Sequence, residues 1–337
     1  MQPDVSVIVP VYNVEPYLEE CVESLFQQTL ENIEYIFIDD ASTDNSVKIL
    51  RKVISRYPEK AERIRLILHD KNKGIAFTRQ EGINKATGKY IIHCDSDDIV
   101  DHDIYNRLLA EAIKEDADIV VCSYELFGEN THKRIISQGK EQTISSFQML
   151  ERLCGAGSGK LHGSLCNKLI RKEICDRTEI PQGVSYCEDE TSLITLVANN
   201  KNLKIKIIPD SLYKYRLRNN SLTLNKNPRR EKEIKILIEI LENLKARNPE
   251  NFHRCINSKI IELLYAALLS GASSKNICSQ YSYYKNKLDH NNSLNYFRKL
   301  QLKATLNHFH LLSKLIGFSN QEAIKLIKRI RNFSHKK

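Results

Sequence analysis

Three aspartates lie within four consecutive positions, at Asp95, Asp97 and Asp98. Carboxylates this close repel one another and raise each other's pKa, unless a cation lies among them. Hard oxygen ligands of this kind suit Mg²⁺ or Mn²⁺ bound together with the phosphates of a substrate. The spacing therefore predicts a metal–diphosphate site, and the alternative is a turn that only caps a helix.

Polar and aromatic side chains follow three other short apolar runs of the sequence. Tyr12 comes after the first run, residues 39–44 (DDASTD) after the second, and residues 72–74 (NKG) after the third, with Arg79 close behind. An acidic residue in such a place is often a helix cap, and this is the simplest interpretation of Asp44. The other side chains are candidates for one shared site.

The elements that must position these residues alternate between strand and helix. Short apolar runs of strand length are Val5–Val9, Tyr35–Ile38, Ile64–Leu68, Tyr90–His93 and Ile119–Cys122. Amphipathic stretches of helical length are Tyr17–Phe26, Val47–Arg56, Ala76–Ala86 and Ile104–Lys114. This alternation predicts an α/β fold, with a mostly parallel, Rossmann-like sheet and helices on both faces. Such sheets bind ligands at the carboxyl ends of their strands, where the candidate residues lie.

The regular alternation fades from about residue 130. The remaining pattern predicts a short helix at Phe147–Leu153, a Gly-rich loop at 155–163, a helix from about Glu190, and strands at Leu203–Ile208 and Leu212–Arg216. After Pro228 the pattern is helical, with breaks near Gly271 and at 290–292. We therefore expect a catalytic α/β domain over residues 1–225 and a basic, helical C-terminal region over residues 226–337.

The Gly-rich loop invites comparison with a phosphate-binding P-loop. That motif needs Gly where this chain has Cys154, and Ser or Thr where it has Leu161. No GxGxxG follows the first strand, which disfavours a dinucleotide fold. We interpret the loop as a cover over the acceptor side. His69, His93 and His162 show no metal-ligand spacing and are interpreted as packing or hydrogen-bonding residues.

Five phrases occur in one order along residues 4–220. They are VSVIVPVYN, IDDASTD, NKGIAFTRQEGINKATGKYI, DSDD, and the pair Glu188-Asp189 within SYCEDE. In this set the chain resembles the inverting family-2 glycosyltransferases of the kind that build bacterial surface polysaccharide, which have the A-type glycosyltransferase fold. The resemblance implies transfer of a hexose or N-acetylhexosamine from a nucleotide diphosphate sugar, a UDP-sugar being expected, to a hydroxyl of a glycan or lipid-linked acceptor.

The resemblance also implies roles for residues on the nucleotide side. Tyr12 would stack on the base beside the backbone of Pro10 and Val11. Asp40 would accept a hydrogen bond from the base, and Arg79 would lie near the diphosphate. The family often has Gly where Ala41 stands and Ala-Arg-Asn where residues 78–80 (TRQ) stand, which leaves the placement around Arg79 open.

The reacting groups come from the later phrases. The resemblance places Asp95 and Ser96 at the ribose or sugar, and Asp97, with Asp95, at a Mn²⁺ or Mg²⁺ ion. Asp189 would be the catalytic base with Glu188 beside it. A base here would lie near a helix N-terminus, which favours the carboxylate form. Residues 213–216 (YKYR) resemble a segment that follows the base in this family, so Arg216 would reach the leaving diphosphate.

Two other functions fit part of this pattern. A nucleotidyltransferase can share the sheet and the metal aspartates, but the VPVYNVEP segment is not the Gly-rich, basic loop such enzymes carry after the first strand. A non-catalytic module that binds a nucleotide sugar would not need Asp189. Both stay as alternatives to the transferase.

The net charge of +9 is unevenly placed. Residues 301–337 hold eight Lys and Arg and one Glu, and therefore carry +7 of it. Ile324, Ile327 and Ile330 recur at helical spacing among these cations, so the tail is either a helix on an anionic membrane surface or a solvated helix face. No nucleic-acid partner is expected. The nine cysteines form no CxxC pair, and no apolar run is long enough to span a membrane. We expect a cytoplasmic enzyme that is peripheral on the inner face of the membrane.

Overall fold

The computed structural model describes residues 2–128, 131–218, 229–269, 280–291, 294–307, 313 and 316. The chain divides into two compact units. The first comprises residues 1–153 and 159–225, and the second comprises residues 154–158 and 226–337. Each unit is described by itself.

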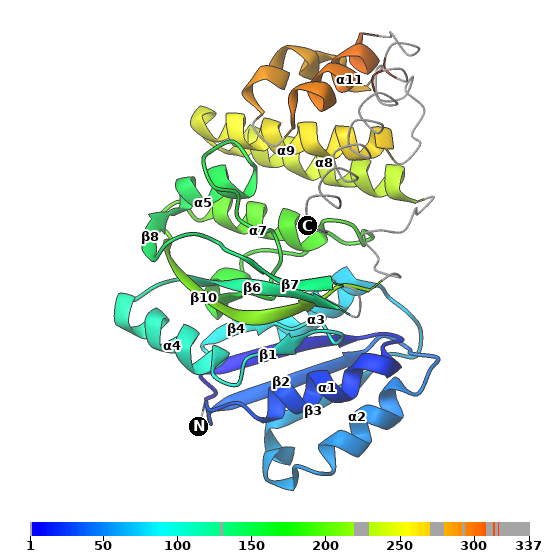
Figure 1. The fold of residues 1–337 in the computed structure, drawn as a ribbon, viewed down its shortest axis with the longest axis vertical. Coiled ribbons are helices and arrows are strands. Elements are labelled where there is room, and N and C mark those ends of the chain that lie inside the picture. Colours follow the sequence, from blue (N-terminus) through cyan, green and yellow to red (C-terminus); the bar gives the residue numbers. More distant parts are fainter. Residues whose placement is uncertain are drawn as a thin grey trace, which may run out of the picture. The chain divides into compact units, whose positions relative to one another are not determined.

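A mixed sheet forms the centre of the first unit (Figure 1). Its strands are β1 (Val5–Val11), β2 (Ile33–Asp39), β3 (Ile64–Leu68), β4 (Tyr90–His93), β5 (Ile99–Val100), β6 (Ile119–Gly128), β7 (Thr131–Ile136), β8 (Gln142–Ser145), β9 (Lys168–Arg171) and β10 (Lys204–Arg216). The strand order is β3-β2-β1-β4-β9-β6-β10-β5, and β7 and β8 pair with β6 and β10. Neighbours are parallel from β3 to β4 and between β6 and β10, whereas β9 is antiparallel to both of its neighbours.

Helices cover both faces of the parallel part. They are α1 (Glu15–Phe26), α2 (Ser46–Ile54), α3 (Ile75–Lys85), α4 (Ile104–Glu115), α5 (Ser146–Leu153), α6 (Lys172–Cys175) and α7 (Glu188–Asn199), with a 3₁₀ turn at Pro58–Arg63. Alternate residues of a strand point to opposite faces. Val7 and Val9 therefore share a core with Leu18 of α1, while Ile8 meets α3 on the other face. The α/β class is confirmed.

Close approach of α3 to the sheet depends on Gly82. A Cβ atom at this position would lie 2.3 Å from Cγ2 of Ile8 and 3.2 Å from Cδ1 of Ile38. Only glycine lets the helix come so near, because any larger side chain would displace Ile8 in a close-packed interior. The approach of Gly82 to the sheet determines how far Arg79, one helical turn earlier in α3, lies from the ends of the strands.

The turns that follow β1 and β2 are held together by side chains. Asn13 and Ala41 have positive φ angles of 50° and 60°. Asn13 accepts a hydrogen bond from Thr43 N, at 2.8 Å. Asp44 accepts from the backbone N–H groups of Ser46 and Glu15 near the starts of α2 and α1. Asp44 is not the N-cap residue itself, which is Asn45 in α2 and Val14 in α1, but it binds the first N–H group of each helix, and the turns form one hydrogen-bonded rim.

Several elements differ from expectation. Strands β5, β7, β8 and β9 were not predicted. β5, β8 and β9 are short and pair with strands distant in sequence, whereas β7 pairs with the strand just before it, β6, and its sequence, THKRII, lacks a long apolar run. The two strands expected at 203–208 and 212–216 are one strand, β10, whose pairing with β6 is irregular between Ile207 and Tyr213. Pro209 lies in this irregular part, where a missing N–H is tolerated.

The second unit is helical in its described residues. It contains α8 (Arg230–Arg247), α9 (Glu250–Leu269), a 3₁₀ segment at Ser282–His290, and α11 (Tyr296–Leu306). An unpredicted break at Asn248 and Pro249 separates the first two helices. The expected break at Gly271 and almost all of the basic tail lie outside the described residues. None of the helices in the described ranges is long and apolar enough to cross a membrane.

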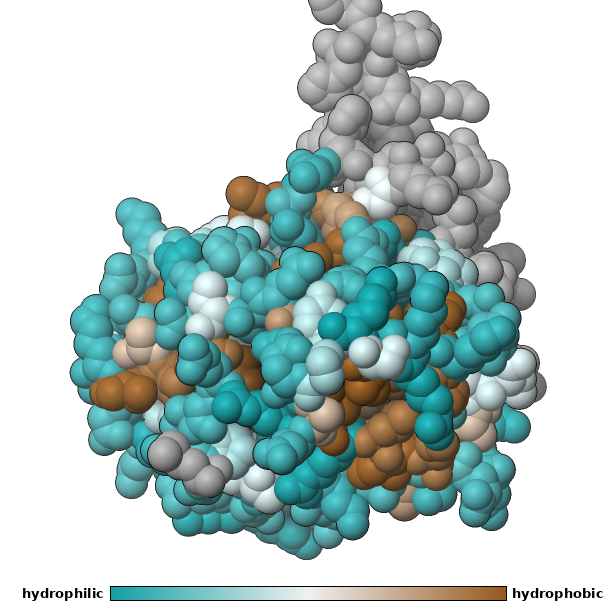
Figure 2. Space-filling view, turned by 90° about the horizontal axis from the view of Figure 1, so that it is seen from below, coloured by the Kyte–Doolittle hydropathy of each residue, from teal (hydrophilic) through white to brown (hydrophobic). Residues whose placement is uncertain are grey.

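The face of the molecule seen from below is largely hydrophilic, with patches of apolar side chains (Figure 2). In the first unit, Leu68 on β3 and Phe77 on α3 are large apolar side chains with substantial exposure. β3 ends the sheet order and is only five residues long, and a short edge strand offers little backbone for unwanted pairing.

Candidate functional site

Strand register brings the candidate residues to one edge of the sheet. Val11 of β1 pairs with Asp39 of β2, and Asp40 N donates to Val11 O at 2.8 Å. On the other side of β1, β4 ends just before Cys94, whose N–H donates to Ile8 O. The segments after β1, β2 and β4 are therefore neighbours, as expected for the carboxyl edge of a parallel sheet.

Asp40 is buried and is held by three donors. Its Oδ1 accepts from His69 Nδ1 at 2.7 Å and from Lys73 N at 2.8 Å, and its Oδ2 accepts from Gly74 N at 2.8 Å. Asn72 Nδ2 also lies 3.3 Å from the Asp40 carbonyl oxygen. The NKG segment thus wraps around this carboxylate. His69, interpreted from sequence as a packing or hydrogen-bonding residue, is a hydrogen-bonding one.

Tyr12 stands beside Asp40 and is 47% exposed, while Pro10 and Val11 are buried in β1. An exposed aromatic ring at a strand end offers a flat surface for stacking. Asp39 is also buried there, and its Oδ1 has no hydrogen-bond partner within the described part of the chain. The sequence analysis assigned no role to Asp39.

Arg79 joins two distant parts of the chain. The side chain is only 4% exposed, and it donates from Nη1 to Glu188 Oε1 at 2.6 Å and from Nη2 to Asp95 Oδ1 at 2.8 Å. Its Nε has no partner among the described residues. A buried guanidinium with two carboxylates fixes both of them, because removing any member would leave a buried charge unpaired. The structure therefore brings Arg79, Asp95 and Glu188 together.

Glu188 and Asp189 begin α7 in different environments. Glu188 is 6% exposed, and burial raises the pKa of its carboxyl to about 7, although Arg79 opposes that shift. Asp189 is half-buried, accepts from Glu190 N at 2.7 Å, and also has a pKa raised by burial. Glu188 is thus committed to Arg79, while Asp189 is the more accessible carboxylate of the pair.

A buried lysine holds the segment that runs beside α7. Lys168 donates to the carbonyl oxygens of His162 and Ser164 and to Asn167 Oδ1, at 2.7, 2.7 and 2.8 Å. Burial lowers the pKa of its ammonium to about 8. Gly163 lies so close to α7 that a Cβ atom would meet Glu190 Cγ at 2.3 Å. Lys168 was missed by sequence reasoning, since nothing in its flanking residues distinguishes it from a surface lysine.

The aspartates after β4 do not share one environment. Asp98 is buried and accepts from Tyr213 Oη at 2.6 Å and Arg216 N at 2.7 Å, which ties the loop to β10. Asp97 pairs with Arg218 Nε at 2.5 Å, and its pKa is raised by burial and by Asp95, with Arg218 opposing. Ser96 between them is buried. Asp98 therefore holds the loop against β10. Asp97 instead lies near a second carboxylate, that of Asp95.

Two arginines near the end of β10 converge on the Asp97 loop. Arg216 donates to the Asp97 carbonyl oxygen at 2.7 Å and to Glu20 at 2.6 Å. Its guanidinium lies over Phe127, 4.5 Å from the ring centroid, and over Tyr17 at 5.1 Å. Arg218, two residues on, was not singled out from the sequence. Cations at this end of β10 suit an anionic group beside the Asp97 loop.

No group of three or more His, Cys, Asp or Glu side chains with metal-binding geometry occurs among the residues that the structure describes. Two protein carboxylates are nevertheless enough for a magnesium-type ion when substrate phosphates complete its shell. Asp95 and Asp97 fit this arrangement. Burial and the neighbouring Asp95 carboxylate raise the pKa of Asp97, and a divalent cation would favour the ionised form of both.

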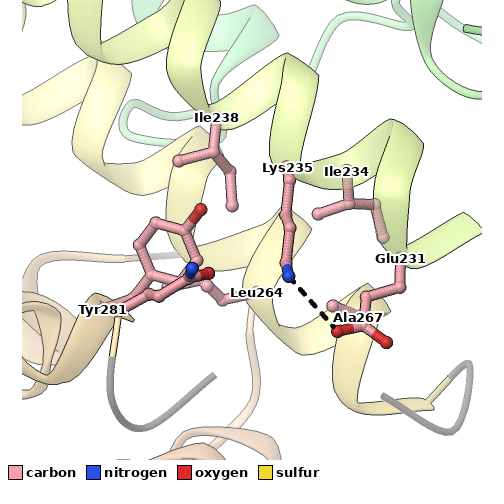
Figure 3. A pocket seen from close by; sticks show the side chains of 8 residues that line it. Glu231, Ile234, Lys235, Ile238, Leu264, Ala267 and Tyr281 are labelled. Carbon is pink, nitrogen blue, oxygen red and sulfur yellow. Dashed lines mark ion pairs between the residues drawn. The ribbon is translucent and has the colours of Figure 1, made fainter. Parts of the chain in front are cut away.

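The second unit offers a smaller hollow, lined by Ile234, Ile238, Leu264, Ala267 and Tyr281 (Figure 3). Lys235 extends across it toward Glu231, with 3.7 Å between Nζ and Oε1. The space holds little more than one water molecule and is too small for a nucleotide. The candidate residues for binding a donor are those at the edge of the sheet.

The mixed sheet, with acidic and aromatic residues at its carboxyl edge, has the A-type glycosyltransferase fold, which solved structures share. Residues 6–178, just over half of the chain, match the family model described as Glycosyl transferase family 2. The chain therefore belongs to glycosyl transferase family 2, which confirms the resemblance seen in the sequence.

Individual relatives extend this match. The chain is 34% identical over 226 residues to a glycosyltransferase named EpsJ from Bacillus subtilis (strain 168), covering 66% of this chain and 64% of that protein. It thus spans less than two thirds of this relative's length. Among solved structures, S. aureus TarS 1–349 in complex with UDP-GlcNAc has a TM-score of 0.72 at 17% identity, covering 95% of this chain and 92% of that one. The mannosyltransferase PcManGT from Pyrobaculum calidifontis, in complex with GDP-Man and Mn²⁺, has a TM-score of 0.54 at 17% identity, covering 91% and 85%. These likenesses show the fold.

Proposed function

We propose that this protein is an inverting glycosyltransferase that moves a hexose or N-acetylhexosamine from a UDP-sugar to a hydroxyl of a glycan or lipid-linked acceptor, in surface polysaccharide synthesis. The observation that carries the proposal is the Arg79 bridge. It links Asp95, after β4, to Glu188, beside Asp189 at the start of α7. The residues proposed to bind the donor and the residue proposed to act as the base are thereby connected through one network of ion pairs. The UDP-GlcNAc complex of TarS supports a sugar of this class.

The donor would lie along the sheet edge. Tyr12 would stack on the base beside Pro10 and Val11, and Asp40 would accept a hydrogen bond from it. Asp95 and Ser96 would lie at the ribose or sugar. The support is that these residues follow neighbouring strands and that the Tyr12 ring is exposed next to a buried carboxylate.

Asp97, with Asp95 beside it, would hold Mn²⁺ or Mg²⁺. Such an ion, when bound, stabilises negative charge on a departing diphosphate. Arg216 and the newly found Arg218 would add positive charge near the same phosphates. The Mn²⁺ complex of PcManGT supports a metal in this fold.

Asp189 would act as the general base. It would take the proton of the acceptor hydroxyl as the oxygen attacks the anomeric carbon, and the sugar–diphosphate bond would break in the same step. A single displacement inverts the stereocentre. Glu188 would hold Arg79 in place rather than react, since its carboxylate is already bound by that guanidinium.

A panel of nucleotide sugars with Mn²⁺ tests this proposal. Slow hydrolysis of one donor should release a nucleoside diphosphate, and Asp189→Asn should bind the same donor but transfer poorly. Release of pyrophosphate instead would indicate a nucleotidyltransferase. Tight binding without turnover, with any acceptor tried, would indicate a binding module.

The basic residues 301–337 suggest a cytoplasmic enzyme that attaches to the anionic inner face of a membrane. Truncation at residue 300 should abolish sedimentation with anionic liposomes at low salt and spare donor hydrolysis. A wild-type protein that never sediments with them would contradict the attachment.

A further inference from the structure

His69 lies buried between two carboxylates that come from different elements. Its Nδ1 is 2.7 Å from Asp40 Oδ1, after β2, and its Nε2 is 2.7 Å from Glu81 Oε2, on α3. The side chain of His69 is 2% exposed, and that of Glu81 is 23% exposed. A ring nitrogen donates only when it carries a proton, and an ionised carboxylate only accepts. Both contacts are therefore hydrogen bonds when the ring is an imidazolium shared by two carboxylates.

The hydrogen bonds at Asp40 leave little freedom. Each carboxylate oxygen accepts about two hydrogen bonds. Oδ1 has two, from His69 and Lys73 N, and Oδ2 has one, from Gly74 N. Within the described part of the chain, one acceptor position therefore remains, and it belongs to Oδ2. The carboxylate cannot rotate without losing bonds in a buried place, where lost bonds are costly.

The other groups around His69 reinforce this orientation. The Phe77 ring of α3 meets the imidazole edge-on, with centroids 5.8 Å apart, and the Lys73 ammonium lies 4.6 Å from the Phe77 centroid. The backbone N–H of His69 donates to Asp39 O at 2.9 Å. Asp40, Glu81 and Lys73 are the charged residues in these contacts. Together these contacts hold the imidazole ring and the Asp40 carboxylate in one orientation.

We propose that His69 is a positioning residue that makes the site select its nucleotide base. By bridging Glu81 and Asp40 it presents Oδ2 of Asp40 as a fixed acceptor, which favours a base with a ring N–H, such as uracil, over cytosine, whose corresponding nitrogen only accepts. The inference rests on the proposed function in one respect, the placement of the base at Tyr12 and Asp40. Neither His69 nor Glu81 has a role in that proposal.

Calorimetry with UDP and CDP on the full chain tests the bridge. His69→Ala should weaken UDP binding about tenfold and narrow the preference for UDP over CDP, because a charge-assisted bond to Asp40 is lost. His69→Gln should recover part of the affinity, since its amide can still donate to Asp40. At saturating donor, the kcat of hydrolysis should change less than about twofold while KM rises. His102→Ala, at a 72% exposed histidine side chain, is the matched control.

The comparison with Asp40→Ala separates the two ideas. If Asp40→Ala loses UDP affinity while His69→Ala keeps both affinity and preference, the bridge is merely structural and the proposed function stands. If Asp40→Ala also binds UDP normally, the base site itself is misplaced and both ideas fail. If His69→Ala does not fold, Glu81→Ala decides, because it removes the second acceptor of the imidazole at a partly exposed side chain. A few-fold loss of UDP preference supports the bridge, and an unchanged preference overturns it.

Discussion

Asp40 and the aspartates after β4 lie on the same edge of the sheet, but the protein surrounds them differently. Asp40 has one histidine and two backbone N–H groups as donors. Around Arg79, by contrast, Asp95, Glu188 and Asp189 crowd near one guanidinium, and burial raises the pKa of both Glu188 and Asp189. In the first region, hydrogen-bond donors balance the charge of the Asp40 carboxylate, which suits the recognition of a ligand. The second carries excess negative charge, which suits proton transfer and binding of cations.

The largest effect should follow from a substitution at Asp97, on the loop that also carries Asp95. Asp97→Ala should lower turnover about a thousandfold, since stabilising charge on a diphosphate is worth several kcal/mol. The fold should survive, because Asp98 and not Asp97 ties the loop to β10. A chelator should mimic the substitution in the wild-type protein. Full activity in excess EDTA would remove the metal from the proposal.

Asp189→Asn should slow transfer by at least roughly a hundredfold, because the amide cannot take a proton and general base catalysis contributes about 10²–10⁴-fold. UDP-sugar affinity should barely change, since Asp40 and Asp97 remain. Stopped assays of transfer, paired with calorimetry, check both parts. Near wild-type transfer by Asp189→Asn, with loss in Glu188→Gln, would show that the base is the other carboxylate.

Asp40→Ala tests the region around Asp40 and should affect only the binding of the donor. The loss of one hydrogen bond to a charged group is worth roughly 1.5–3 kcal/mol, so UDP affinity should fall about ten- to a hundredfold. The kcat at saturating donor should stay close to that of the wild type. Calorimetry that finds unchanged UDP affinity would contradict the assignment of the base to this carboxylate.

The smallest effect should appear in the pH profile. The pKa of Glu188 is raised to about 7 by burial, and that of its neighbour Asp189 is raised too. A base must be ionised, so kcat/KM should fall on an acid limb that lies above the ordinary pKa of an aspartate, by at most tenfold per pH unit. Glu188→Gln should move this limb to lower pH, because one of two like charges disappears. An acid limb of kcat/KM near pH 4 would show that the pKa values of Glu188 and Asp189 are not raised.

Sequence patterns predicted the parallel half of the fold well, because its helices and strands alternate with clear periodicity. They failed for β8 and β9, whose pairing is decided by distant partners, and for β7, whose residues lack a long apolar run. The candidate residues of the site came from motif and resemblance, and their roles stay proposals. Arg218 was not predicted because its partner Asp97 is distant in sequence, and Lys168 was not predicted because its flanking residues resemble those of a surface lysine. His69 was noticed, but only the structure shows Glu81 on its other nitrogen.

The Arg79 bridge has a consequence for the synthesis of the protein on the ribosome. Both of its carboxylate partners follow it in the chain, Asp95 by 16 residues and Glu188 by 109. At roughly 5–20 residues per second of synthesis, the ribosome needs at least several seconds to deliver that partner after Arg79 has emerged. A nascent chain that ends before α7 contains the parallel strands β1 to β4 but lacks the proposed base. Under the proposed function, an unfinished chain should therefore be unable to transfer a sugar.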